Sequence, residues 1–151
     1  MSHITDFQVG YEFTPVRFQI QPKEVELYLR AAGEPNALFK QQGFVPPTAL
    51  AAYALSGILR EINLPGGAIH SAQDASVSRP ITSDEAIVFS ATLIQNAVRN
   101  GWRFVSVTFT GVDEDDYRVI HGRSTVVIPE ADVEDMDRCD LAVSFLRSAR
   151  W

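Results

Sequence analysis

A short loop after the first predicted helix carries the chain's best candidate for acid–base chemistry. Glu34 follows Gly33 in this loop, and Asn36 stands two residues further on. A positioned carboxylate can activate a water molecule as a general base, with a neighbouring amide orienting that water. Because exposed glutamates are seldom catalytic, a solvated loop carboxylate is the simpler interpretation of Glu34.

The other chemically capable residues are scattered. His70 and His121 fall in strand-like segments, where structural, hydrogen-bonded histidines outnumber proton shuttles. Arg79 precedes a proline and suits either a phosphate or a structural hydrogen bond in the turn. The acidic run 113–116 lacks the ligand spacing of a calcium loop, and Cys139 is the single cysteine. The sequence therefore predicts no metal site and no cofactor.

Composition limits the class of protein. The 151 residues are 46% hydrophobic and 21% charged, as expected for one compact globular domain. A net charge of −6 disfavours nucleic acid and anionic membranes as partners. The single cysteine fits a reducing compartment, and we see neither an export signal nor a run of about 18 apolar residues. We therefore expect a cytoplasmic protein.

Helical periodicity predicts two helices in the first half of the chain. One follows a short strand at 13–20 and runs from Pro22 to the stop at Gly33. We expect an irregular loop between Gly33 and Pro47 because glycine, proline and asparagine recur there. Residues 48–63 are apolar almost all round, which predicts a long buried helix.

The second half of the chain is dominated by strand patterns. Candidate strands cover residues 68–78, 87–95, 102–112 and 117–128, joined by short connections that favour antiparallel neighbours. A curved sheet of about five strands would bury the long helix. We predict one domain over residues 1–129, followed by an acidic extension at 130–151. The extension has helical spacing in its apolar residues, namely Met136, Cys139, Val143 and Leu146.

Several segments resemble the MaoC-like hydratase/dehydratase family. The most specific match is the loop Ala31–Phe39, which contains Gly-Glu-Pro-Asn, together with Gly43–Thr48, where Val-Pro-Pro-Thr leads into the long helix. Weaker matches are Ile69–Asp74, Ser78–Glu85 with its Arg-Pro turn, and Gly122–Thr125. The pattern is most similar to the fungal-fatty-acid-synthase-like N-terminal dehydratase branch.

This resemblance implies an α+β hot-dog fold, in which a curved antiparallel sheet wraps a long central helix. It also implies reversible hydration of an enoyl thioester by an Asp and a His, with backbone amides at the helix start binding the enolate oxygen. Here Glu34 takes the place of the Asp, Phe39 takes the place of the His, and Asn36 matches. Pro46 and Pro47 remove two amides from the start of the helix.

The same resemblance suggests which residues contact substrate. Phe39, Phe44 and Tyr53 could line an acyl tunnel, although aromatic residues beside a buried helix are first of all core residues. Thr48, at the start of the long helix, is a further candidate for contact with substrate. Arg79 could meet a phosphate of coenzyme A or of an acyl carrier protein.

Three functions remain open from the sequence. The first is a non-catalytic subunit that binds acyl-CoA or acyl-carrier-protein thioesters and completes the site of a catalytic MaoC-like partner in fatty acid metabolism. The second is an active hydratase, or a hot-dog thioesterase, that uses Glu34. The third is a ligand-binding dimer outside thioester metabolism. An open sheet edge favours a homodimer or a heterodimer in each case.

Overall fold

A computed structural model describes residues 2–130, so nearly all of the predicted C-terminal extension lies outside the described residues. Strand β1 (Ser2–His3) is followed by a 3₁₀ turn at Ile4–Asp6 and by β2 (Val16–Gln19). Three helices come next: α1 (Pro22–Ala32), α2 (Ala37–Gln42) and α3 (Pro47–Leu59). The remaining strands are β3 (Ile62–Asn63), β4 (Ile69–Val77), β5 (Ala86–Arg99), β6 (Trp102–Val112) and β7 (Arg118–Pro129).

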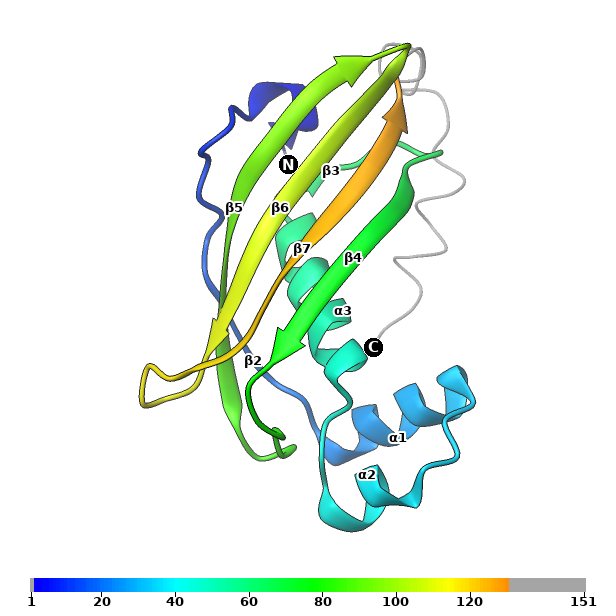
Figure 1. Cartoon of the computed structure of the whole chain (residues 1–151), viewed down its shortest axis with the longest axis vertical. Helices are drawn as coiled ribbons and strands as arrows, with labels where there is room; N and C mark the ends of the chain where they lie inside the picture. The colour runs from blue at the N-terminus through cyan, green and yellow to red at the C-terminus, as the bar shows by residue number, and fades with distance from the viewer. Residues whose placement is uncertain (1, 131–151) are drawn as a thin grey trace.

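Five strands form one curved antiparallel sheet in the order β2-β5-β6-β7-β4, and α3 lies against one face of it (Figure 1). This confirms the predicted α+β architecture and its antiparallel strands. Strand β5 continues to Arg99, beyond the predicted end at 95, because a bulge between Leu93 and Gln95 shifts the register and pairing with β6 resumes. A separate two-residue parallel ladder between β1 and β3 was not predicted.

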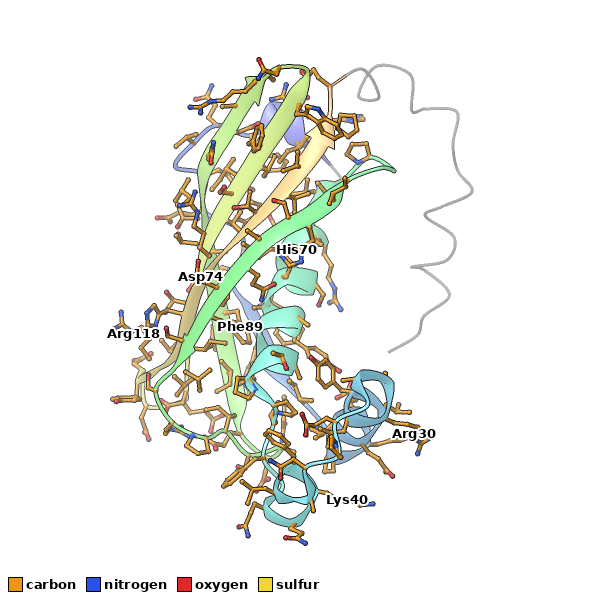
Figure 2. The ribbon with its side chains drawn as sticks, turned by 45° about the vertical axis from the view of Figure 1, so that its right-hand side comes forward. Arg30, Lys40, His70, Asp74, Phe89 and Arg118 are labelled. Atoms are coloured by element: carbon orange, nitrogen blue, oxygen red, sulfur yellow. The ribbon has the colours of Figure 1, made fainter. Side chains whose placement is uncertain are left out.

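The two faces of the sheet differ in chemistry because side chains alternate along each strand. On β6, Val105, Val107 and Phe109 are buried on the face that meets α3, whereas Thr108 is exposed on the opposite face. Phe89 of β5 lies in the same interior layer, between the sheet and α3 (Figure 2). The apolar layer of the sheet therefore covers the apolar helix, as the sequence predicts.

Helix α3 ends earlier than the sequence predicts. It begins at Pro47 but stops at Leu59 rather than at residue 63. The amide of Glu61 then bonds to the carbonyl of Ile58 in a turn, and Ile62 is buried in β3 instead of continuing the helix. The prediction was wrong at this end because Ile62 keeps the i, i+4 apolar spacing from Ile58 although the chain has already turned.

The segment between Gly33 and Pro47 is not the irregular loop that we predicted, because it contains α2. The side-chain oxygen of Asn36 accepts the amide N–H of Leu38 at 3.0 Å and caps the first turn. Gly33 and Gly43 adopt left-handed conformations with φ of 64° and 65°, which end α1 and α2. The glycine and asparagine residues of this segment thus mark the ends of a short helix, and do not form a loop.

Two glycines allow the sheet to pack tightly. A Cβ atom on Gly122 of β7 would lie 2.2 Å from the backbone oxygen of Asp74 and 2.7 Å from the ring of Phe109. A Cβ atom on Gly111 of β6 would lie 2.6 Å from Ile120 and 2.8 Å from Phe89. The space that a side chain would need at these positions is filled by neighbouring core atoms, so glycine is required by close approach.

Candidate functional site

A cavity of about 780 Å³ lies between α1 and α2, and it contains the loop that the sequence singled out. Glu34, Asn36 and Phe39 all line it, so the structure brings these three predicted site residues together. Helix α1 forms one wall and α2 the other; Arg30 and Lys40 mark these two helices in Figure 2. The cavity is therefore the candidate functional site of the described chain.

Glu34 is placed by the end of α1 and by its own loop. Its amide donates to the carbonyl of Leu29 at 3.0 Å, closing α1, and its Oε1 accepts the amide N–H of Asn36 at 2.9 Å. Asn36 in turn uses Oδ1 to cap α2. Both side chains are exposed, and each accepts a backbone amide two residues further along the chain. These contacts fit the simpler interpretation, in which both residues shape the turn.

Phe39 supplies an apolar wall at the position where the resemblance predicts an imidazole. Its ring is half-buried. The chain has three histidines, all within residues 2–130, and none of them lines the cavity. His70 instead places Nε2 2.9 Å from Oγ of the buried Ser124, and His121 is exposed on β7. The cavity thus contains two carboxylates that can act as a base, Glu34 of the loop and Glu26 of α1.

The start of α3 offers little for binding a developing oxyanion. Pro46 and Pro47 occupy the first positions and have no amide N–H, as the sequence predicts. The amides of Ala49 and Leu50 both donate to the carbonyl of Pro46, at 2.9 and 3.2 Å. Among the amides at the start of α3, that of Thr48 has no backbone acceptor within the described residues, and Thr48 does not line the cavity.

Phe44 and Tyr53, which we predicted to contact an acyl chain, do not line the cavity either. Phe44 is half-buried and forms an isolated β-bridge with Thr82. Tyr53 of α3 packs edge-on against Phe18, with ring centroids 5.8 Å apart. Partial burial, and then the nearby carboxylate of Glu24, raise the pKa of Tyr53 to about 12, so its phenol stays protonated at neutral pH. Their contact with a substrate stays a prediction.

Arg79 lies in an ion-pair cluster rather than at the cavity. Its Nη2 is 2.7 Å from Oε2 of Glu85 and 2.7 Å from Oδ2 of Asp113. Hydrogen bonds from the guanidinium lower the pKa of both carboxyls and raise the pKa of Arg79. This cluster ties the turn before β5 to the β6–β7 hairpin, and a phosphate would have to compete with two carboxylates for Arg79. Its predicted phosphate contact is untested.

The sequence did not identify the basic side chains of the cavity. Lys23, Arg30 and Lys40 line it and are exposed, and Arg30 lies 3.6 Å from Glu26 one helical turn away. The spacing of Lys23 and Arg30 on one face of α1 could have indicated this wall. Ser83 also lines the cavity, but it comes from a distant turn that only the folded chain brings near.

Comparison with known proteins gives matches through structure alone. No protein-family profile matches the chain, and no curated protein matches its sequence significantly. Three solved structures illustrate the match. An (R)-hydratase, PhaJ1 of Pseudomonas aeruginosa, has a TM-score of 0.68 at 14% identity, covering 85% of this chain and 86% of that one. The HadBC (3R)-hydroxyacyl-ACP dehydratase complex of Mycobacterium tuberculosis has a TM-score of 0.65 at 16% identity, covering 80% and 96%. A MaoC-like dehydratase of Rhodospirillum rubrum has a TM-score of 0.63 at 14% identity, covering 85% and 97%.

These likenesses define the class: the chain has the hot-dog fold. More particularly, its fold is the one seen in MaoC-like dehydratases and (R)-hydratases, which confirms the structural side of the predicted resemblance. At such low identities the match shows the fold, and the chemistry must be argued from the site. Within residues 2–130, no helix is long and apolar enough to span a membrane.

Proposed function

We propose that this chain binds an acyl thioester without processing it and completes the site of a catalytic MaoC-like partner. The observation that carries the proposal is the cavity between α1 and α2, which keeps Glu34 and Asn36 but has Phe39 at the position of the expected imidazole. A phenyl ring neither accepts nor donates a proton, so one half of the acid–base pair is missing. We place this role in cytoplasmic fatty acid metabolism.

The lining of the cavity supports an acyl thioester as the ligand. Val25, Leu29 and Phe39 provide apolar surface suited to an acyl chain. Lys23 and Lys40 add positive charge, which suits the phosphates of coenzyme A or of a phosphopantetheine arm. A ligand with an apolar tail and an anionic handle matches both parts of this wall.

Acyl-CoA binding should stabilise the folded chain. We expect crotonyl-CoA, or a longer acyl-CoA, to raise the melting temperature. At a concentration of 100 times Kd, the ligand should increase the free energy of unfolding by about 2.7 kcal/mol. Phe39→Ser should reduce this ligand-dependent shift because it removes apolar wall. Leu38→Ser is the matched control, since Leu38 is exposed and lies outside the cavity. If no acyl-CoA shifts the melting temperature, the thioester proposal fails and a ligand of another class is favoured.

The open edge of β4 supports assembly with a second hot-dog chain. Strand β4 pairs with β7 on one side only, and its residues are exposed from Ile69 to Ser76. Such an edge presents unpaired backbone groups that natural proteins usually cover. HadBC, one of the similar structures, is a complex. We therefore propose a homodimer or a heterodimer with a related catalytic subunit.

Light scattering checks this assembly. At micromolar concentration we expect twice the mass of one chain, or a stable complex once the catalytic partner is added. Gln73→Pro, in the middle of β4, should weaken assembly because proline removes an amide N–H that faces the open edge. The amide of Ser78 donates to the carbonyl of Val119, so in the register of β4 with β7 every second amide faces β7, and the amide of Gln73 faces outward. Gln73→Ser keeps this amide and is the matched control. A monomer that captures no hot-dog partner would contradict the proposal.

A second candidate function keeps Glu34 as a base. Oε2 of Glu34 has no hydrogen-bond partner among the described residues, so a water molecule in the cavity could meet it. The chain would then be a hydratase or a thioesterase in its own right.

A further inference from the structure

The face of the sheet that points away from α3 is apolar at one end, whereas its exposed residues are mostly polar further along. Val105, Val107 and Val126 lie with Leu55 and Ile58 of α3 around the interior of the fold. Alternation along the strands therefore puts residues 104, 106, 125 and 127 on the opposite face. Figure 1 looks onto this face, with α3 behind it.

One end of this outer face carries a continuous apolar row. Ile69 of β4 pairs with Val127 of β7, Val127 pairs with Phe104 of β6, and Phe104 pairs with Ala97 of β5. Registered partners share a face, so these residues form one row across four strands. In the next row of the same face, Trp102 pairs with Pro129. We call these six residues the outer apolar patch.

The patch is exposed among the described residues. Ile69 is 53% exposed and Trp102 is 40% exposed, while Val127, Phe104 and Ala97 are half-buried. The fully exposed residues further along the outer face are mostly polar, among them Ser90, Thr108, His121 and Arg123. A tryptophan and an isoleucine exposed together at one end of a face whose other exposed residues are mostly polar indicate that something covers that end.

The chain itself supplies an occupant, because β7 ends at the patch. Glu130 is fixed beside Trp102: its amide donates to the carbonyl of Gly101 at 2.8 Å, and Arg103 binds both of its carboxylate oxygens, at 2.6 and 3.1 Å. Residues 131–151 therefore start from an anchored point next to Pro129 and Trp102. A tethered segment reaches a neighbouring surface at a high effective concentration.

The sequence of this segment matches the patch in pattern and in length. Met136, Cys139, Val143 and Leu146 recur at spacings of three and four residues, as on one face of a helix. From Met136 to Leu146 a helix would extend about 15 Å. The apolar row crosses four strands, three intervals of about 4.8 Å, or about 14 Å. Residues 131–135 can span at most about 17 Å, which is sufficient to reach the row.

We infer that residues 131–151 dock on the outer apolar patch through the stripe of Met136, Cys139, Val143 and Leu146. Three of the acidic residues of the segment, Asp132, Glu134 and Asp135, fall between the anchor and the stripe. Exposed Arg99, which pairs with Trp102 in the sheet register, lies at the margin of the patch to meet them. The segment therefore belongs to this face of the domain and leaves the cavity between α1 and α2 uncovered.

Tryptophan fluorescence of the full chain tests this inference. The chain has two tryptophans, so Trp151→Phe leaves Trp102 as the single reporter. In that background, Val143→Asp with Leu146→Asp should shift Trp102 emission to the red and increase its quenching by acrylamide. Ser144→Asp with Ser148→Asp adds the same charge off the stripe and should leave Trp102 unchanged. Hydrogen exchange should show loss of protection in residues 136–146 for the first pair only.

Other outcomes would overturn the inference. If both pairs of substitutions leave Trp102 equally accessible and residues 136–146 equally unprotected, the segment does not cover the patch. If protection of Trp102 instead depends on protein concentration and follows a doubling of mass, a second copy covers the patch. Ile69→Lys, at an exposed position on the patch, offers an independent check, because it should release the segment without touching the segment's own sequence.

Discussion

Purified alone, the chain is expected to hydrate crotonyl-CoA about 10²–10⁴-fold more slowly than an enzyme with a positioned acid–base residue. The reason is Phe39, which lines the cavity at the position where the resemblance predicts the imidazole, because a phenyl ring cannot transfer a proton. The prolines at the start of α3 remove oxyanion donors as well, and one lost donor typically costs about 10²–10³-fold. Because losses of groups that act together do not simply multiply, we expect a loss of at least about 10²–10⁴-fold in the rate of hydration.

Adding a hot-dog partner with the intact Asp and His should restore turnover if this chain completes that partner's site. Within the complex, Glu34→Gln should change the rate little, because the carboxylate serves mainly its own loop. Glu26→Gln is the matched control, since Glu26 lines the same cavity from α1. Spectrophotometric loss of the enoyl thioester measures the rate in each case.

The opposite outcome identifies the second candidate function. If the lone chain turns over at about 1–10³ s⁻¹, and Glu34→Gln lowers this by about 10²-fold or more, then Glu34 is a base and the chain is an enzyme. Release of free coenzyme A thiol would indicate thioester hydrolysis. Its absence would indicate hydration of the double bond.

Gly122→Ala is expected to destabilise the fold by about 3 kcal/mol or more, at the upper end of what overpacking usually costs. The added Cβ would lie 2.2 Å from the backbone oxygen of Asp74, so the pairing of β4 with β7 would have to shift. The ring of Phe109, 2.7 Å away, would have to move as well. Urea unfolding of the full chain measures the loss.

Gly57→Ala in α3 is the matched control. Its Cβ would lie 3.1 Å from the ring of Phe18, a side chain that can adjust, and not against backbone. Alanine also favours a helix over glycine by about 1 kcal/mol, which offsets a small clash. The control should therefore stay within about 1 kcal/mol of the parent protein. Equal unfolding free energies for the two variants would show that β7 does not approach β4 as closely as described.

The fold was predictable where side-chain periodicity is strong. The apolar stripe of α3 and the alternation along β6 both lead directly to a helix covered by a sheet. The six residues of α2 escaped prediction because they are too few to show a period, and the capping role of Asn36 is visible only once the helix exists. The end of α3 was predicted too late for the opposite reason, because the apolar i, i+4 spacing continues to Ile62, past the last helical residue Leu59.

The candidate site was predictable only where its residues are neighbours in sequence. Glu34, Asn36 and Phe39 lie within six positions and fold into one wall. Ser83 reaches the same cavity through tertiary folding, which no local pattern encodes. Arg79 precedes a turn in sequence, but its direction is set by Glu85 and by Asp113 of a distant hairpin, so its ion pairs could not be foreseen.

The order of strands in the sheet also affects how the chain folds. Strands β5, β6 and β7 are joined by short turns and form a meander of local contacts, which is typical of the part of a sheet that forms early. Strands β2 and β4 both pair with strands far along the chain and occupy the two edges, so each must close a long loop first. The edge at β4, to which a second hot-dog chain would add, is therefore among the last to form. A partner strand that arrives during synthesis would meet an incomplete sheet, and this would link the rate of assembly to the rate of folding.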